Sequence, residues 1–280
     1  MWGGRSWLRA RRLAGWSNGF SATPSARLEA GLQARLPTPP AATIELVSWK
    51  RAWWRTVAGI VLFGAAFGYV EAAVVAYLRA IYSPWHAHYY PATPADDLFP
   101  LLTLDQLHEM GPEHVTRLKV ELGRELATLL MLGGAAVMVG RNLREWVAVF
   151  VACFGVWDIV FYLALKALLN WPASLFTWDL LFLVPVPWVG PVLAPVLVSL
   201  SMIGVGLAVL WREYRGGPVE IGRMRWVAIL LGGVLVFASF TADFMNTTTG
   251  GYPKAFHWPI FLAGEATWLV AFCMAFNRRA

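Results

Sequence analysis

Residues 56–78 read TVAGIVLFGAAFGYVEAAVVAYL, an apolar run whose single charged side chain is Glu71. An α-helix rises about 1.5 Å per residue, so about 20 such residues cross the roughly 30 Å hydrocarbon core of a bilayer. The stretch therefore predicts a transmembrane helix. Five further runs of similar length and character follow it, at residues 120–139, 146–165, 190–211, 226–245 and 258–276.

The composition of the whole chain agrees with this interpretation. Of 280 residues, 58% are hydrophobic and 14% are charged, against about 45–50% and about 25% in soluble domains. This excludes an ordinary soluble enzyme. The predicted fold is an all-α integral membrane protein, a bundle of about six transmembrane helices with interfacial or re-entrant segments on the outer side.

The distribution of positive charge predicts the orientation of the bundle. Of the 23 Lys and Arg, all but Arg79, Arg117, Lys119, Arg124, Lys166 and Lys254 fall on one side of the six spans. Loops rich in Lys and Arg stay in the cytoplasm, so both termini are predicted to be cytoplasmic. The same rule accounts for the net charge of +6, and we expect no nucleic-acid partner.

The N-terminal segment differs from the rest in composition. Residues 1–48 contain Arg, Ser and small residues and the Pro-rich stretch from Pro37 to Pro40, which predicts a disordered basic cytoplasmic tail. The segment lacks the apolar centre of a secretory signal, although an Arg-rich, acid-poor start is also typical of an organellar transit peptide. Residues 49–280 are predicted to form the membrane domain.

Ionisable residues inside the predicted spans are the best functional candidates. Each costs about 2.5–3.5 kcal/mol near the centre of a membrane helix, and such residues mark ion pathways and proton relays. The second span must begin before Glu121, because the uncharged run after Glu125 is too short to cross alone. The candidate intramembrane polar cluster consists of Glu71, Arg79, Glu121, Arg124, Glu125, Asp158, Tyr162, Lys166, Asp243 and Glu265.

Helical spacing favours an inward-facing position for several of these side chains. Gly64, Gly68 and Glu71 lie on one helix face, so close helix packing at the glycines is expected to bring Glu71 against a neighbouring helix. Two further sets share a face, namely Glu121, Arg124 and Glu125, and Asp158, Tyr162 and Lys166. Acids outnumber bases, which favours protonatable carboxyls, with Glu71 and Glu265 foremost. The alternative, that interhelical ion pairs only fix the packing, stays open.

All five histidines fall in predicted outer loops. This position excludes a haem with two axial histidines on the spans. An outer metal site would draw on His86, His88, His108 and His114, but these lack the i, i+4 spacing of a zinc-binding helix. We therefore predict no metal site, and the sequence assigns no cofactor.

The connection between the third and fourth spans, residues 170–189, is apolar and rich in Trp and Pro. Such a loop lies in the membrane interface or re-enters between helices. The favoured prediction is an amphipathic interfacial helix over residues 174–184, followed by a Pro-rich turn. Leu101, Leu104 and Leu107 predict a second interfacial helix in the first outer loop.

Three strings resemble an uncharacterised family of bacterial polytopic inner-membrane proteins. They are ELGRELATLLML at residues 121–132, FGVWDIVFYLALK at 154–166 and WPASLFTWDLLFLVPVPWVGPVLAP at 171–195. The resemblance spans residues 57–210. It implies a multi-pass protein of the bacterial inner (cytoplasmic) membrane and carries no activity with it.

Three functions remain open at this point. The first is ion- or proton-coupled transport of a small molecule through the polar cluster. The second is a structural or assembly subunit of a larger membrane complex, or a homo-oligomer, that docks through its aromatic faces. The third is a membrane enzyme acting on a lipid-type substrate, with Glu121 and Glu125 transferring protons and Arg124 holding a phosphate. No complete catalytic motif decides whether the chain is an enzyme.

Overall fold

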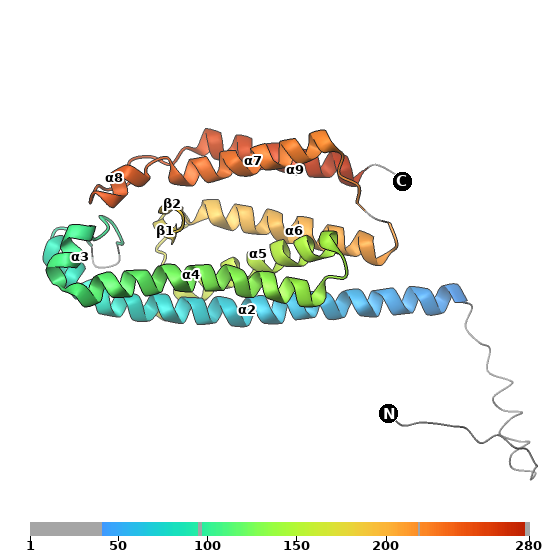
Figure 1. The fold of residues 1–280 in the computed structure, drawn as a ribbon, viewed down its shortest axis with the longest axis horizontal. Helices are drawn as coiled ribbons and strands as arrows, with labels where there is room; N and C mark the ends of the chain where they lie inside the picture. Colours follow the sequence, from blue (N-terminus) through green and yellow to red (C-terminus); the bar gives the residue numbers. More distant parts are fainter. Residues whose placement is uncertain (1–40, 95–96, 218, 278–280) are drawn as a thin grey trace, which may run out of the picture. The chain divides into compact units, whose positions relative to one another are not determined.

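The computed structural model describes residues 41–94, 97–217 and 219–277. The chain divides into two compact units, Met1–Leu46 and Val47–Ala280, and all contacts reported below lie within the second. The elements, in chain order, are α2 (Ala41–Tyr89), α3 (Leu104–Met110), α4 (Pro112–Val139), α5 (Leu143–Leu169), β1 (Trp178–Phe182), β2 (Trp188–Pro191), α6 (Leu193–Tyr214), α7 (Arg223–Thr241), α8 (Phe244–Thr248) and α9 (Trp258–Phe276) (Figure 1).

Within the described residues, six helical segments are long and apolar enough to cross a membrane. This confirms the predicted number of spans, and the chain is a multi-pass membrane protein. The helices extend beyond several predicted bounds, and α4 begins at Pro112, as the short uncharged run required. The predicted tail lies outside the described residues as far as residue 40, and α2 begins at Ala41.

Successive spans run in opposite directions, which gives the bundle two ends (Figure 1). One end carries the α4–α5 and α6–α7 connections with Arg141, Arg144, Arg215 and Arg223, and we call it the basic end. The other end carries α3, the β1–β2 hairpin and α8, and we call it the hairpin end.

Close packing of α2 against α5 depends on two glycines. A Cβ atom at Gly64 would lie 3.1 Å from the carbonyl oxygen of Cys153, and one at Gly68 would lie 3.1 Å from the backbone nitrogen of Phe161. The absence of side chains here lets the two backbones approach, as small residues do in membrane helices. The next turn of the same face carries Glu71, which contacts α4, so the predicted inward position of Glu71 is confirmed.

The connection between α5 and α6 folds as a β-hairpin, and the prediction of a helix over residues 174–184 is wrong. Strands β1 and β2 are antiparallel, with Trp178 opposite Pro191 and Leu180 opposite Val189. The aromatic residues Trp178 and Phe182 at the two ends of β1 are of a kind enriched in strands. The two strands pair with each other, and the hairpin packs on α5. Strand pairing gives hydrogen-bond partners to backbone N–H and C=O groups that would lack them in apolar surroundings.

The connection between α2 and α4 contains a short helix near the one predicted there, although it begins at Leu104 and leaves Leu101 outside. Thr103 caps α3, with Gln106 completing a capping box, and Gly111 at φ 129° ends it just before Pro112 opens α4. The fifth predicted span is broken near its end. Helix α7 stops at Thr241, and Asp243 precedes the short helix α8.

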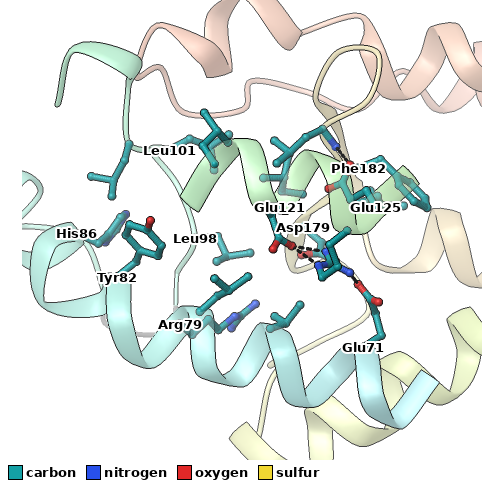
Figure 2. Close-up of a pocket in the computed structure, with 18 of the residues that line it drawn as sticks. Glu71, Arg79, Tyr82, His86, Leu98, Leu101, Glu121, Glu125, Asp179 and Phe182 are labelled. Carbon is teal, nitrogen blue, oxygen red and sulfur yellow. Dashed lines mark hydrogen bonds and ion pairs between the residues drawn. The ribbon is translucent and has the colours of Figure 1, made fainter. Parts of the chain in front are cut away.

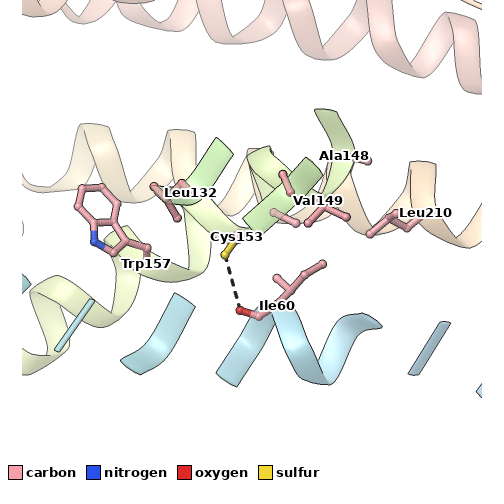
Figure 3. Packing of buried hydrophobic residues seen from close by; sticks show 9 residues of the cluster. Ile60, Leu132, Ala148, Val149, Cys153, Trp157 and Leu210 are labelled. Atoms are coloured by element: carbon pink, nitrogen blue, oxygen red, sulfur yellow. Dashed lines mark hydrogen bonds between the residues drawn. The ribbon is translucent and has the colours of Figure 1, made fainter. Parts of the chain in front are cut away.

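Buried apolar side chains from α2, α4, α5 and α6 fill the middle of the bundle (Figure 3). We call this cluster the apolar plug; its members are Ile60, Leu132, Ala136, Ala148, Val149, Ala152, Cys153, Trp157 and Leu210. The plug lies on the side of the polar residues that faces the basic end, because its α2 and α4 members precede Glu71 and follow Thr128 along their helices.

Candidate functional site

A pocket of about 440 Å³ lies between α2, α4, α5, the hairpin and the connection before α3 (Figure 2). Its volume is within the range of about 300–1,000 Å³ typical of small-molecule sites. The walls are mostly apolar, with several Leu side chains and the rings of Trp157, Phe161 and Phe182. The charged residues that line it are Glu71, Arg79, Asp97, Arg117, Glu121, Arg124, Glu125, Asp158 and Asp179, and His86 and Tyr162 also contribute.

The pocket follows one face of each of two helices. On α4 its lining runs from Arg117 to Thr128 in helical steps, a distance of about 16 Å along the axis at 1.5 Å per residue. On α2 the lining runs from His86 back to Glu71. The stretch of pocket along α4 is thus about half as long as a membrane core of roughly 30 Å is thick.

Arg124 connects α4 to α2 through two carboxylates. It forms an ion pair with Glu71, and its Nε donates to Glu121 Oε1 at 2.6 Å. The hydroxyl of Thr128 contacts the second oxygen of Glu71 at 3.5 Å. One guanidinium is thus shared by two carboxylates, and the trio as a whole keeps a negative charge when both acids are ionised.

Asp179, in β1, is 4% exposed and lies at the junction of three elements. The hydroxyl of Tyr162 on α5 donates to Asp179 Oδ2 at 2.8 Å. Arg79 on α2 attracts the carboxylate electrostatically, and its guanidinium lies 3.8 Å from the ring centroid of Trp171. Burial away from water outweighs these favourable contacts and raises the pKa of Asp179 to about 6, since desolvation penalises the charged form.

Asp158 lies deeper, where α5 meets α6. Ser199 of α6 donates a hydrogen bond of 2.8 Å to Asp158 Oδ2, and the aspartate is 7% exposed. Gly155, one turn earlier, makes this contact possible, because a Cβ there would lie 2.8 Å from Ile203 Cγ1 and push α6 away. The hydrogen bond that Asp158 accepts from Ser199 therefore comes from a neutral hydroxyl.

Glu125 joins α4 to the hairpin. Its Oε2 accepts a hydrogen bond of 2.9 Å from the backbone N–H of Leu183, just after β1. A buried carboxylate that accepts a backbone donor at this position holds the strand end in place. Glu125 thus shapes one wall of the pocket as well as lining it.

Trp157 separates the pocket from the apolar plug. It is 5% exposed, belongs to the plug and also lines the pocket. Its indole N–H is buried and has no hydrogen-bond partner within the described part of the chain. A buried donor of this kind normally finds an acceptor.

Three members of the predicted cluster lie elsewhere. Lys166 donates to the carbonyl oxygens of Asn170 and Pro172 at 3.2 and 3.0 Å, at the C-terminal end of α5. Asp243 accepts from the side chain of Asn246 and the backbone N–H of Lys254, each at 3.2 Å. The spacing of these residues along the chain could not predict these positions, because it does not show which segments pack against the ends of the helices.

Glu265 is the third, on α9 outside the pocket lining. It is 6% exposed, and neither oxygen has a hydrogen bond of good geometry within the described residues. Ser201 and Trp268 are the polar side chains that interact with it more weakly. The structure thus separates Glu265 from Glu71, the other acid singled out from the sequence.

The candidate outer histidines do not converge. His86 Nε2 lies 3.0 Å from the carbonyl oxygen of Pro100, and His108 Nδ1 lies 2.7 Å from that of Leu104. The rings of His114 and His88 lie against aromatic neighbours. Among the residues that the structure places, no three His, Cys, Asp or Glu side chains form a group able to hold a metal ion.

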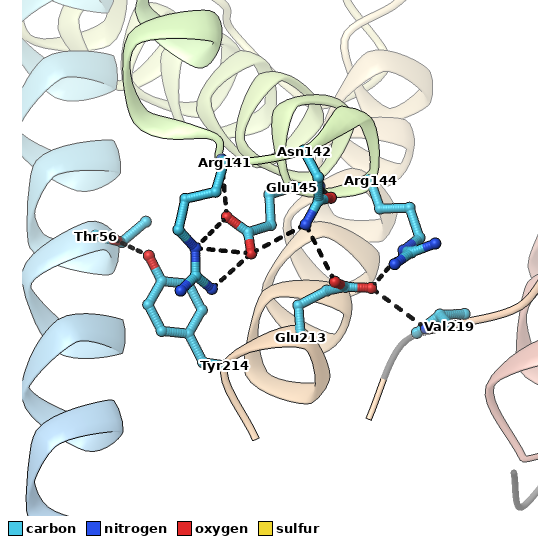
Figure 4. Close-up of polar contacts among 8 residues, drawn as sticks. All are labelled: Thr56, Arg141, Asn142, Arg144, Glu145, Glu213, Tyr214 and Val219. Carbon is cyan, nitrogen blue, oxygen red and sulfur yellow. Dashed lines mark hydrogen bonds and ion pairs between the residues drawn. The ribbon is translucent and has the colours of Figure 1, made fainter. Parts of the chain in front are cut away.

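A polar network fastens the basic end (Figure 4). Arg141 forms a bidentate contact with Glu145 at 2.6–3.0 Å, which raises the pKa of Arg141. Glu213 at the end of α6 accepts from Arg144 at 2.6 Å. The hydroxyls of Thr56 on α2 and Tyr214 on α6 are 2.8 Å apart. These contacts link α2, α5 and α6 beyond the apolar plug.

Asp179 is the main pocket residue that sequence reasoning left unassigned. It is a lone acid in an otherwise apolar, Trp- and Pro-rich connection. An isolated acid in such a segment is the feature of the sequence that could have marked Asp179 as a site residue. Arg117, which is exposed, and Asp97, which is half-buried, also line the pocket and are not among the residues predicted to form the polar cluster.

No family model, no curated protein and no solved structure matches this chain. The resemblance to uncharacterised bacterial membrane proteins therefore stays an expectation, and the functional argument depends on the pocket.

Proposed function

We propose that the protein is a proton-coupled transporter of a small molecule, with the pocket as its binding site. The observation that carries the proposal is one cavity that collects carboxyl groups from α2, α4, α5 and β1 and guanidinium groups from α2 and α4, among helices long and apolar enough to cross a membrane. Ionisable residues inside a membrane are costly and are typical of ion and proton pathways.

The asymmetry of the bundle supports this proposal. The pocket opens toward the hairpin end, whereas the apolar plug and the network around Glu145 and Glu213 close the basic end. A transporter alternates between states that expose its central site to one side and then to the other. The structure has the features expected of one such state.

We place the chain in a bacterial inner membrane with both termini in the cytoplasm. The Arg residues of the α4–α5 and α6–α7 connections lie at the basic end, and the positive-inside rule assigns that end to the cytoplasm. The pocket mouth then faces the outer side.

The lipid-enzyme alternative depended on Arg124 to hold a phosphate. Arg124 already pairs with Glu71 and Glu121, so a phosphate would have to displace two carboxylates. We therefore favour transport.

The test is solute-driven proton movement in proteoliposomes. Purified protein is reconstituted with the dye pyranine inside at pH 6 and an outside pH of 8, and fractions of a low-molecular-mass cell extract are added. We expect at least one fraction to dissipate the gradient with the wild type and not with Asp158→Asn. Glu109→Gln, an acid at the hairpin end outside the pocket lining, is the matched control and should behave as wild type. Equal rates for wild type and Asp158→Asn with every fraction would contradict the proposal.

A further inference from the structure

The charge balance of the pocket favours a ligand of positive charge. The lining holds six carboxylic acids, namely Glu71, Asp97, Glu121, Glu125, Asp158 and Asp179, and three guanidinium groups, namely Arg79, Arg117 and Arg124. Pairing each guanidinium with one carboxylate leaves three acids over. Once these surplus carboxyls lose their protons, the cleft has low-dielectric walls and an excess of negative charge, which favours a cation.

The arginines deep in the pocket already have carboxylate and aromatic neighbours. Arg124 is held by Glu71 and Glu121, and Arg79 lies on Trp171 and interacts with Asp179. An anionic ligand would have to compete with these contacts. Asp158, by contrast, accepts a hydrogen bond from the neutral hydroxyl of Ser199, so we assign to its carboxylate the pairing with a ligand cation.

Three aromatic rings line the same pocket as Asp158. The ring centroids of Trp157 and Phe161 are 6.3 Å apart, and those of Trp157 and Phe182 are 6.2 Å apart. All three side chains line the pocket. Aromatic faces attract organic cations, with Trp the strongest, and the attraction increases where water is excluded.

We propose that the pocket binds a small organic cation with an apolar body, whose charge pairs with Asp158 and Asp179 and whose body lies on Trp157 and the surrounding leucines. This inference rests on the proposed transport function and names its substrate class. The cavity of about 440 Å³ has room for an aromatic or branched amine. The unpartnered indole N–H of Trp157 supplies a donor for an oxygen on such a ligand.

Binding of the cation displaces a proton from the pocket. Asp179 faces Arg79 of α2 and both Tyr162 and Asp158 of α5, and its buried carboxyl keeps its proton to a higher pH than an exposed aspartate does. When the cation arrives, the O–H bond of the carboxyl breaks and the proton leaves to bulk water through the mouth. Exchange of cation for proton is the coupling that this site provides.

The probe for the test is benzyltrimethylammonium, a quaternary cation that has no proton of its own to lose. Phenylmethanesulfonate has the same benzyl body with a negative head group, and 2,2-dimethylpropylbenzene is the neutral isostere. Binding of each to the full chain in lipid nanodiscs is measured by titration calorimetry at pH 6, in two buffers of different ionisation enthalpy. The difference between the two buffers gives the number of protons released.

We expect the cation alone to bind, with release of protons. Asp158→Asn keeps an oxygen to accept from Ser199 and should weaken binding about tenfold or more, whereas Glu109→Gln should not change it. If Asp158→Asn does not fold, proton release by the wild type and the comparison of the three probes still test whether the pocket prefers a cation. Equal or tighter binding of the sulfonate, or of the neutral isostere, would overturn the inference, as would binding without proton release.

The inference and the proposed function fail in different ways. Proton-coupled flux driven only by anionic or neutral fractions would overturn the substrate class and leave transport standing. Cation binding with proton release, but without flux in proteoliposomes, would support the substrate class and overturn transport.

Discussion

The hydroxyl of Tyr162 on α5 lies 2.8 Å from Oδ2 of Asp179 in β1 and donates a hydrogen bond to it. Both side chains are buried. This contact attaches the hairpin to the membrane helices and places an acid from a loop inside a pocket formed mainly by helices. The hairpin is thus a wall of the candidate site, and the contact has measurable consequences.

Tyr162→Phe should destabilise the protein by about 1–3 kcal/mol, because it removes the hydroxyl donor from a buried carboxyl. Thermal unfolding in detergent, followed by circular dichroism, measures the effect. Tyr77→Phe, at a tyrosine that is 71% exposed on α2, is the matched control and should leave the midpoint unchanged. Equal midpoints for the two variants would show that the contact does not hold the hairpin.

Asp179 should make stability depend on pH. Burial raises its pKa from 3.8 to about 6, so the folded chain binds the proton more tightly than the unfolded chain. The stability that this gives is complete below pH 3.8 and is lost as pH rises through about 6. Between pH 5 and pH 7 the melting temperature of wild type should therefore fall relative to that of Asp179→Asn. A constant difference across that interval would contradict the assigned environment of the carboxyl.

Gly68→Ala should destabilise the bundle by about 1–3 kcal/mol through overpacking. The added methyl group would meet the backbone of α5, whereas a Cβ at Gly59 on the same helix would meet nothing within 4 Å. Gly59→Ala should therefore be neutral, or stabilising by up to about 1 kcal/mol through helix propensity. Unfolding of the two variants in the same detergent compares them directly. If Gly59→Ala were the more damaging change, the α2–α5 contact would be wrong.

Features that depend on nearby residues could be predicted from the sequence, and features that depend on contacts between distant segments could not. Spans could be read because the membrane requires long apolar runs, and the packing of α2 followed from the spacing of Gly64 and Gly68. The hairpin could not, because its strands are specified by each other and by contacts with Tyr162 and Glu125 far along the chain.

The pocket lining contains the predicted residues of α2 and α4 and, on α5, Asp158 and Tyr162, whereas Lys166, Asp243 and Glu265 lie outside it. Helical spacing tells which residues share a face, as it did for Glu121, Arg124 and Glu125. It does not tell which helices are neighbours, and so it could not separate Glu265 from Glu71. For the same reason, the sequence could not predict that Asp179 lies near Arg79.

The network at the basic end should control access to Cys153. Glu213→Gln weakens the contact with Arg144 and should increase the rate at which a water-soluble maleimide labels Cys153, which is buried in the apolar plug. The background is Cys273→Ala, which removes the exposed cysteine. Glu220→Gln, in the exposed α6–α7 connection, is the control. Identical labelling rates for the Glu213 and Glu220 variants would mean that the network does not close this end.

The most direct test of the central claim is uptake of radiolabelled benzyltrimethylammonium into proteoliposomes with an acidic interior. The account predicts accumulation that needs the pH gradient, stops when an ionophore collapses it and is lost in Asp158→Asn but not in Glu109→Gln. Accumulation that is the same with and without the gradient, or the same in Asp158→Asn as in wild type, would contradict proton-coupled transport of a cation through this pocket.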